Sequence, residues 1–164
     1  MAEFSISQLA ALCLQNNLQI TTAESCTGGL AAKLITDQAG SSQWFERGFV
    51  TYSNSAKEQM LGVEQSLLEQ WGAVSEPVAK AMAEGALTHS DADFALSITG
   101  IAGPDGGSAE KPVGTVCFGW SWYAGSDRHI KGSITTRHFK GDRETVRNQS
   151  AYYALEQLYK LMQS

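Results

Sequence analysis

The sequence predicts an α/β fold, a single three-layer-like domain in which a mixed parallel and antiparallel sheet is flanked by helices. Helix-like and strand-like segments alternate along most of the chain, an order typical of sheets covered by helices. Two long strand-like segments then follow each other across a short turn, and such a hairpin adds antiparallel strands. The chain has 164 residues, 43% of them hydrophobic. That suffices for one buried core, so we assign residues 1–164 to one domain.

The first half of the chain alternates between helix and strand signals. Leu9 and its apolar neighbours recur at helical spacing, Asn54 and Ser75 are suitable helix caps, and Gly62 is a helix stop. Pro77 is tolerated because it falls in a first helical turn. The expected elements are a helix from Ser5 or Ser7 to Asn16, a strand over 18–22, a helix over 28–37, a strand over 45–52, a short helix over 54–61, a helical turn over 65–70 and a helix over 76–88.

The second half carries the hairpin and the longest helix. Residues 94–99 are apolar enough for a buried strand, and the glycine-rich segment 100–112 predicts a loop. Strands over 113–123 and 129–139 are expected on either side of a Gly-Ser-Asp turn. Asp142 is a suitable cap for a final amphipathic helix, whose apolar side chains recur to the end of the chain.

Composition argues against several classes of protein. The net charge is −5 and the pI about 5.1, which disfavours nucleic acid as the main partner. No apolar run reaches membrane-spanning length, and the N-terminus lacks the features of a signal peptide, so no membrane association and a cytoplasmic location are expected. Three scattered cysteines and three scattered histidines form no disulfide framework and no metal-ligand pattern.

Charge is distributed unevenly along the chain. Up to Asp127 there are five basic and fourteen acidic residues, whereas from Arg128 onward there are seven basic and three acidic ones. The basic end could bind a small anionic ligand. Its simpler interpretation is an edge strand covered with lysine and arginine.

The segment 21–29, Thr-Thr-Ala-Glu-Ser-Cys-Thr-Gly-Gly, is the most informative part of the sequence. It places hydroxyls and a thiol where a strand passes into a helix. The first amides of a helix lack internal partners, so a nucleophile or an anion there finds hydrogen-bond donors. Gly28 and Gly29 let a ligand approach the backbone. The simpler alternative is an ordinary serine or threonine cap.

Two further segments lie where ligands bind in α/β proteins. Residues 99–107 leave the end of a strand with four glycines, which is typical of a ligand loop but also of a plain turn. In residues 52–57, Lys57 falls in the first turn of a helix, where the helix dipole and burial lower a lysine pKa. Lys57 is therefore a candidate general base toward a serine, with the Tyr52 phenol relaying a proton or holding the lysine. A surface lysine beside a half-buried tyrosine is the alternative.

Six motifs in register resemble the CinA C-terminal family, the bacterial nicotinamide-mononucleotide deamidases. They are Thr-Ala-Glu-Ser-Cys-Thr-Gly-Gly at 22–29, Tyr-Ser-Asn-Ser-Ala-Lys at 52–57, Gly-Ala-Val-Ser at 72–75, Thr-Gly-Ile-Ala-Gly-Pro at 99–104, Lys-Pro-Val-Gly-Thr-Val at 111–116 and Gly-Asp-Arg at 141–143. The resemblance covers nearly the whole chain. It is closest to the stand-alone form, without the extra N-terminal domain of some relatives.

The resemblance implies an amidohydrolase of pyridine-nucleotide recycling that converts nicotinamide mononucleotide to nicotinic acid mononucleotide and ammonia. Ser25 would be the nucleophile, Lys57 its base and Tyr52 an assisting group. The amides after Ser25 would stabilise the oxyanion, and Arg143 the phosphate, a role that Arg137, Lys140 or Arg147 could also fill. The implied substrate-binding residues are Cys26, Thr27, Gly28, Gly29, Thr99, Gly100, Gly103, Gly106, Gly107 and Arg143. No metal and no cofactor are expected, the partner is a pyridine nucleotide, and a homodimer stays open.

Two other functions remain open at this stage. One is a cysteine amidase that uses Cys26, with Glu24 and Lys57 as helpers, because a helix N-terminus lowers a thiol pKa. The other is a nucleotide-binding regulatory or adaptor protein without catalysis. Ammonia release separates the enzyme from the adaptor, and thiol alkylation separates Cys26 from Ser25.

Overall fold

The computed structural model describes residues 3–164. Met1 and Ala2 lie outside the described residues. Both belong to the expected domain 1–164 and to the N-terminal segment that was considered for a signal peptide. The helices are α1 (Ile6–Asn16), α2 (Leu30–Thr36), the 3-10 helix η1 (Ser41–Gln43), α3 (Asn54–Leu61), α4 (Gln65–Trp71), α5 (Glu76–Thr88) and α6 (Arg143–Met162). The strands are β1 (Ile20–Glu24), β2 (Phe45–Val50), β3 (Phe94–Gly100), β4 (Thr115–Ala124) and β5 (His129–His138).

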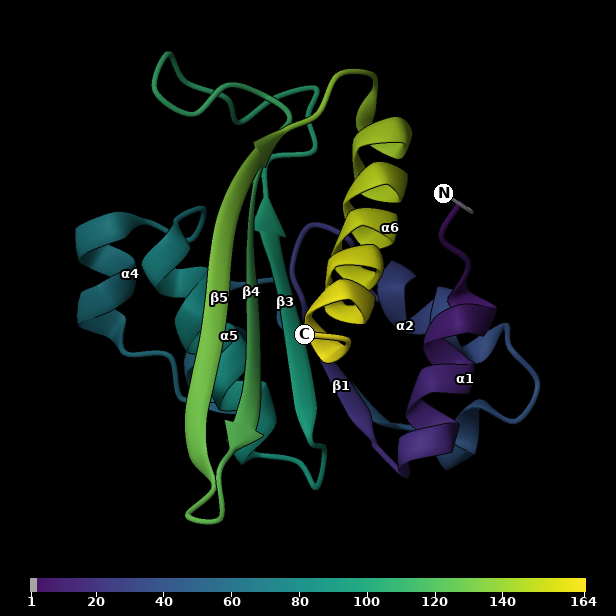
Figure 1. The fold of residues 1–164 in the computed structure, drawn as a ribbon. Coiled ribbons are helices and arrows are strands. Elements are labelled where there is room, and N and C mark those ends of the chain that lie inside the picture. The colour runs from purple at the N-terminus through teal and green to yellow at the C-terminus, as the bar shows by residue number, and fades with distance from the viewer. Residues whose placement is uncertain (1–2) are drawn as a thin grey trace.

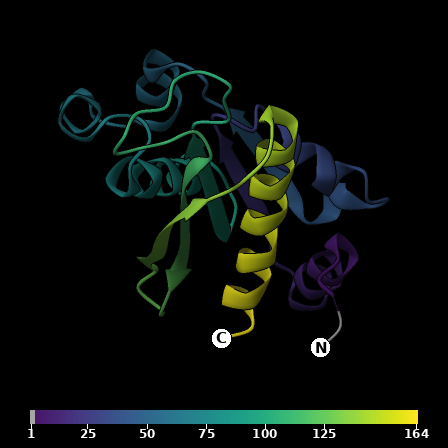
Figure 2. The same cartoon turned by 90° about the horizontal axis from the view of Figure 1, so that it is seen from above.

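The five strands form one mixed sheet in the order β2-β1-β3-β4-β5 (Figure 1). β1 pairs parallel with both β2 and β3, whereas β4 pairs antiparallel with β3 and with β5. Helix α5 packs on β3 and β4 with α3 and α4 beside it, and α1, α2 and α6 lie on the opposite face (Figures 1 and 2). The predicted α/β class, with a mixed sheet between helices, is confirmed.

A hydrophobic core lies on each face of the sheet. On the α6 side, Leu9, Ile35, Phe118 and Leu155 are fully buried, and the indole N–H of Trp120 donates to the carbonyl of Ala154 at 3.0 Å. On the α5 side, the core is built from apolar residues of β1, β3, α3, α4, α5 and the α3–α4 connection, namely Ala23, Leu61, Val63, Leu68, Val78, Met82, Ala86, Leu87 and Ala95.

The close approach of α5 to the sheet depends on one glycine. A Cβ at Gly119 of β4 would lie 2.5 Å from the carbonyl oxygen of Ala79 and 2.7 Å from the hydroxyl of Ser97. That hydroxyl donates to the same carbonyl. Any side chain at position 119 would therefore push α5 off the strand.

Most expected boundaries agree with the structure within two residues, and the differences have local causes. The Ser75 and Asp142 caps are confirmed, since their side chains accept from the amides of Val78 and Thr145. The cap of α3 was placed one residue too late: Ser53, not Asn54, accepts from the Ala56 amide at 3.0 Å.

Helix α2 begins at Leu30 and not at Gly28 as expected. Gly28 and Gly29 have φ values of 58° and 99°, in the left-handed region that a right-handed helix excludes. The two glycines therefore belong to a turn between β1 and α2. This turn includes Ser25 and Cys26, so the backbone around these side chains is not helical.

Candidate active site

The loops that follow the parallel strands meet at one edge of the sheet. Figure 2 looks toward this edge, where the loop over residues 101–114 crosses between the α4 side and the start of α6. A cavity of about 210 Å³ lies there. It is lined by Ser25, Cys26, Tyr52, Asn54, Lys57, Ala73, Val74, Thr99, Gly100, Ala102 and Arg143. Ligands of open α/β sheets bind outside the carboxyl ends of the strands, and the cavity has this position.

Ser25 and Lys57 are in direct contact within this cavity. The Lys57 Nζ lies 3.0 Å from the Ser25 Oγ, and the two side chains come from residues 32 positions apart. Lys57 is only 1% exposed and Ser25 8%. The Ser53 cap starts α3 directly after β2, and this places Lys57 in the first turn with its side chain directed back to the end of β1.

Burial shifts the titration of Lys57 toward the neutral amine. Its Nζ also contacts the backbone carbonyls of Thr51 at 3.0 Å and Tyr52 at 3.2 Å. Among residues 3–164 no carboxylate forms an ion pair with it. Burial lowers the pKa of Lys57 below the 10.5 of an ordinary lysine. With Nζ donating to the Ser25 hydroxyl and to the two carbonyls, the amine has all three contacts directed at oxygen atoms. In the neutral form two N–H groups suffice for the two carbonyls, which would leave the lone pair for the Ser25 hydroxyl.

Glu24, the last residue of β1, binds the start of α2. Its buried carboxylate accepts from the Thr27 hydroxyl at 2.6 Å and from the amides of Gly29, Ala31 and Ala32 at 3.1, 3.0 and 2.9 Å. These contacts use both oxygens. The helix amides that we expected to bind a ligand are therefore occupied by Glu24. The cysteine hypothesis needs Glu24 to assist the Cys26 thiol, but the Glu24 carboxylate forms no hydrogen bond with that thiol.

Only two amides directly after Ser25 stay available. The Gly28 N–H donates to the Ser25 carbonyl at 3.1 Å, and the Leu30 N–H to the Thr27 carbonyl at 3.1 Å. In residues 3–164 no backbone or side-chain oxygen accepts from the N–H groups of Cys26 and Thr27, and the Cys26 N–H faces only the sulfur of its own side chain. On the other side of this turn, Arg147 of α6 donates to the carbonyls of Cys26 and Thr27 at 3.0 and 2.9 Å.

The Cys26 thiol lines the cavity but is a poor nucleophile. Burial raises its pKa to about 12, and the nearby positive charge of Arg147 does not offset this. At neutral pH the sulfur is therefore protonated, whereas the thiolate is the reactive form. The expectation that the helix end lowers this pKa is not met, because burial dominates and the amides of Gly29 and Ala31 at the start of α2 bind Glu24 instead.

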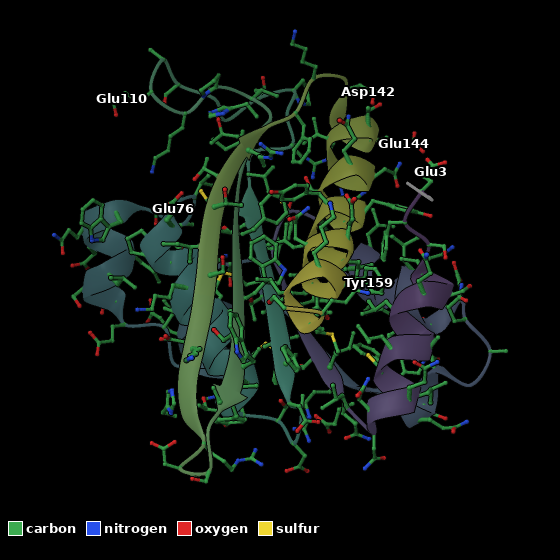
Figure 3. The ribbon with its side chains drawn as sticks, viewed as in Figure 1. Glu3, Glu76, Glu110, Asp142, Glu144 and Tyr159 are labelled. Atoms are coloured by element: carbon green, nitrogen blue, oxygen red, sulfur yellow. The ribbon has the colours of Figure 1, made fainter. Side chains whose placement is uncertain are left out.

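Arg143 and Tyr52 meet at the mouth of the cavity. The guanidinium of Arg143 donates to the Gly103 carbonyl at 2.7 Å and to the Tyr52 hydroxyl at 3.2 Å. The Tyr52 side chain is 61% exposed, and it is the backbone carbonyl of Tyr52, not the phenol, that contacts Lys57. Figure 3 shows Asp142 and Glu144 at the N-terminal end of α6, on either side of Arg143 in the sequence, and Glu110 on the part of the loop far from α6.

The structure brings together seven of the residues named from the sequence. Ser25, Cys26, Tyr52, Lys57, Thr99, Gly100 and Arg143 line the cavity. The remaining six, Thr27, Gly28, Gly29, Gly103, Gly106 and Gly107, do not line it. Thr27 instead binds Glu24, and Gly103 contributes a carbonyl to Arg143.

Sequence reasoning missed Asn54, Ala73, Val74 and Ala102 as lining residues, and it missed the contacts of Arg147. Ala73 and Val74 belong to the motif at 72–75 but carry no reactive group, so only their place in that motif was a signal. The Ala73 carbonyl accepts from the Thr99 hydroxyl at 2.9 Å, which fixes this wall of the cavity.

The described part of the chain has neither a cluster of metal-binding side chains nor a helix that could span a membrane. Residues 3–164 contain no group of three or more histidine, cysteine, aspartate or glutamate side chains that could hold a metal ion. Across the same residues, every helix falls short of the length and apolar character needed to cross a membrane.

Comparison with known proteins gives a consistent result. The sequence model described as "CinA C-terminal domain" matches residues 3–162. Nicotinamide-nucleotide amidohydrolase PncC of Escherichia coli strain K12 is 60% identical over 140 residues, 85% of this chain and 82% of that protein. The protein of the same name from Pseudomonas putida is 51% identical over 145 residues, 88% of this chain and 87% of that protein.

A solved structure has the same fold. The competence-damaged protein (CinA) superfamily protein ECK1530/EC0983 from Escherichia coli superimposes with a TM-score of 0.87 at 38% identity, covering 98% of this chain and 94% of that one. The similarity therefore extends over nearly the whole length of both chains.

Proposed function

The chain belongs to the CinA C-terminal domain family, and we propose that it is an amidohydrolase that converts nicotinamide mononucleotide to nicotinic acid mononucleotide and ammonia. The names of the two relatives from Escherichia coli and Pseudomonas putida support this substrate. The observation that carries the proposal is the 3.0 Å contact between the Lys57 amine and the Ser25 hydroxyl. Its setting at a strand-end cavity gives a substrate access to both groups.

In the proposed reaction, neutral Lys57 removes the Ser25 hydroxyl proton while Oγ attacks the carboxamide carbon. The carbonyl oxygen becomes an oxyanion, and the free N–H groups of Cys26 and Thr27 are the donors we assign to it. The proton on Lys57 then passes to the amide nitrogen, and the C–N bond breaks as ammonia leaves. Water attacks the acyl-serine with Lys57 again as base, which releases the carboxylate product and restores Ser25.

The size of the cavity suggests how the nucleotide lies. Its 210 Å³ is below the range of about 300–1,000 Å³ usual for whole ligands. We therefore place the nicotinamide end in the cavity and the ribose phosphate at its mouth, where Arg143 lies. Arg143 has an N–H bonded to the exposed Tyr52 hydroxyl, a contact that a phosphate can replace.

The two alternatives fit the site less well. A cysteine amidase needs a thiolate, and burial raises the pKa of Cys26 to about 12. An adaptor needs no buried lysine next to a serine. Burying an amine without a carboxylate partner costs free energy of folding. Such a lysine is therefore expected mainly at sites where its reactivity is used.

Ammonia release tests the function. The protein is assayed with nicotinamide mononucleotide, nicotinamide riboside, nicotinamide and a simple aliphatic amide. We expect turnover of the mononucleotide, no turnover by Ser25→Ala, and retained turnover by Cys26→Ser. Nucleotide binding without ammonia release would favour the adaptor, and an inactive Cys26→Ser protein beside an active Ser25→Ala protein would favour the cysteine.

A further inference from the structure

We propose that Glu24 is a positioning residue of this reaction, which holds the turn after Ser25 so that the Cys26 and Thr27 amides stay free for the oxyanion. This inference rests on the proposed function, because it assumes that Ser25 attacks a carbonyl. The Glu24 carboxylate bonds to neither the Ser25 hydroxyl nor the Lys57 amine. It acts through the backbone that carries the nucleophile.

The contacts of Glu24 exceed those of an ordinary helix cap. A cap accepts from one or two amides and is usually a neutral or exposed side chain next to the helix. Glu24 lies six residues before Leu30, is 1% exposed, and accepts four hydrogen bonds. No lysine or arginine in residues 3–164 forms an ion pair with it. A carboxylate buried in this way is tolerated only because all its partners are fixed in place.

These partners determine which amides remain for a substrate. Glu24 accepts hydrogen bonds from the amides of Gly29, Ala31 and Ala32, so these amides cannot bind an anion in the cavity. Its shortest bond, 2.6 Å to the Thr27 hydroxyl, fixes the middle of the turn.

The turn is held from its other side as well. Arg147 binds the carbonyls of Cys26 and Thr27. In a trans peptide the N–H points opposite to the C=O of the same unit, so the bond to the Cys26 carbonyl also fixes the direction of the Thr27 N–H. With the carbonyls bound on one side and the helix amides on the other, the Cys26 and Thr27 N–H groups are the donors left over.

Glu24→Gln perturbs this arrangement with almost no change of shape. One carboxylate oxygen becomes an NH2 group, which must face at least one N–H or O–H donor of the turn or of α2. The turn has to shift, and displacement of oxyanion donors lowers kcat. We expect kcat to fall by a factor on the order of 10 or more, with KM within twofold of wild type. Glu64→Gln, at the exposed N-cap of α4, is the matched control and should keep both constants.

A second readout does not depend on the natural substrate. A fluorophosphonate labels an activated serine: the Oγ–P bond forms, the P–F bond breaks, fluoride leaves, and the base takes the hydroxyl proton. The phosphoryl oxygen uses the same donors as the oxyanion, so Glu24→Gln should slow Ser25 labelling about as much as it lowers kcat. If the wild type labels but releases no ammonia, the proposed function fails and labelling alone decides the role of Glu24. A wild-type protein that does neither overturns both.

The outcomes decide between positioning and mere stability. A Glu24→Gln protein that melts earlier but keeps wild-type kcat and labelling at a temperature where it is folded would show that Glu24 only caps α2. A raised KM at unchanged kcat would overturn the proposal too. If Glu24→Gln does not fold, Thr27→Val decides: it removes the 2.6 Å bond and should lower kcat and labelling several-fold at unchanged KM, whereas wild-type values would refute the inference.

Discussion

Replacement of Lys57 by methionine tests the proposed base most directly. Methionine keeps much of the length of the buried side chain but cannot accept a proton. The other contact of the Ser25 Oγ is the Tyr52 carbonyl at 3.5 Å, which is too distant and too weakly basic to substitute. The full contribution of a general base, a factor of about 10²–10⁴, should therefore be lost from kcat. This corresponds to about 2.7–5.4 kcal/mol of transition-state stabilisation, with KM changed little.

The pH dependence gives a second, independent measure of the same role. In the proposed mechanism the active form is the neutral amine, so kcat/KM should rise with pH through the pKa of Lys57. Burial lowers this pKa, so the rise should be centred below the 10.5 of a free lysine. Lys57→Arg should not restore activity, because a guanidinium stays protonated. Initial rates of ammonia release from pH 6 to 10 provide the measurement. An active Lys57→Arg enzyme, or a flat wild-type profile over this range, would refute the reasoning.

Three further predictions follow from individual contacts. Arg143→Ala should raise KM for the mononucleotide about 10- to 150-fold, the equivalent of one charged hydrogen bond of about 1.5–3 kcal/mol. It should change KM for nicotinamide riboside little, and an equal rise of KM for both substrates would contradict a phosphate role. Cys26 should react slowly with iodoacetamide at pH 8, because burial raises its pKa to about 12, and fast alkylation would show a thiolate. Gly119→Ala should lower the free energy of unfolding by about 1–3 kcal/mol, since its Cβ would lie 2.5 Å from the Ala79 carbonyl oxygen; an unchanged urea midpoint would contradict this packing.

Local patterns were sufficient to predict most of the fold. The Ser75 and Asp142 caps act on amides three residues away, so their signals are contained in short segments. The hairpin is a similar case, because its two strands and its turn are contiguous. The start of α2 was wrong because a pair of glycines is compatible with a helix start or with a left-handed turn, and the choice depends on Glu24 binding from β1.

The sequence motifs predicted which residues form the candidate site, but not how these residues are arranged in space. The pairing of Ser25 with Lys57 came from the chemistry of the two side chains, and their contact depends on β1 and β2 being neighbours in the sheet. Tyr52 was assigned through its phenol, whereas its contact with the lysine is made by its carbonyl, which every residue type has. Backbone contributions of this kind, like the wall formed by Ala73, have no residue-type signature and could not be read from one sequence.

The burial of Lys57 couples protonation of its amine to unfolding of the protein. In the unfolded chain this amine has an ordinary pKa, whereas burial lowers the value in the folded protein. Between the two values the unfolded state binds one proton more, so stability rises with pH across this window and falls as the solution becomes more acidic. Each pH unit of separation corresponds to about 1.36 kcal/mol. The protein thus has a pH dependence of stability below pH 10.5 that arises from a lysine and involves no carboxylate, and it lies in the residue that the proposed chemistry requires to be neutral.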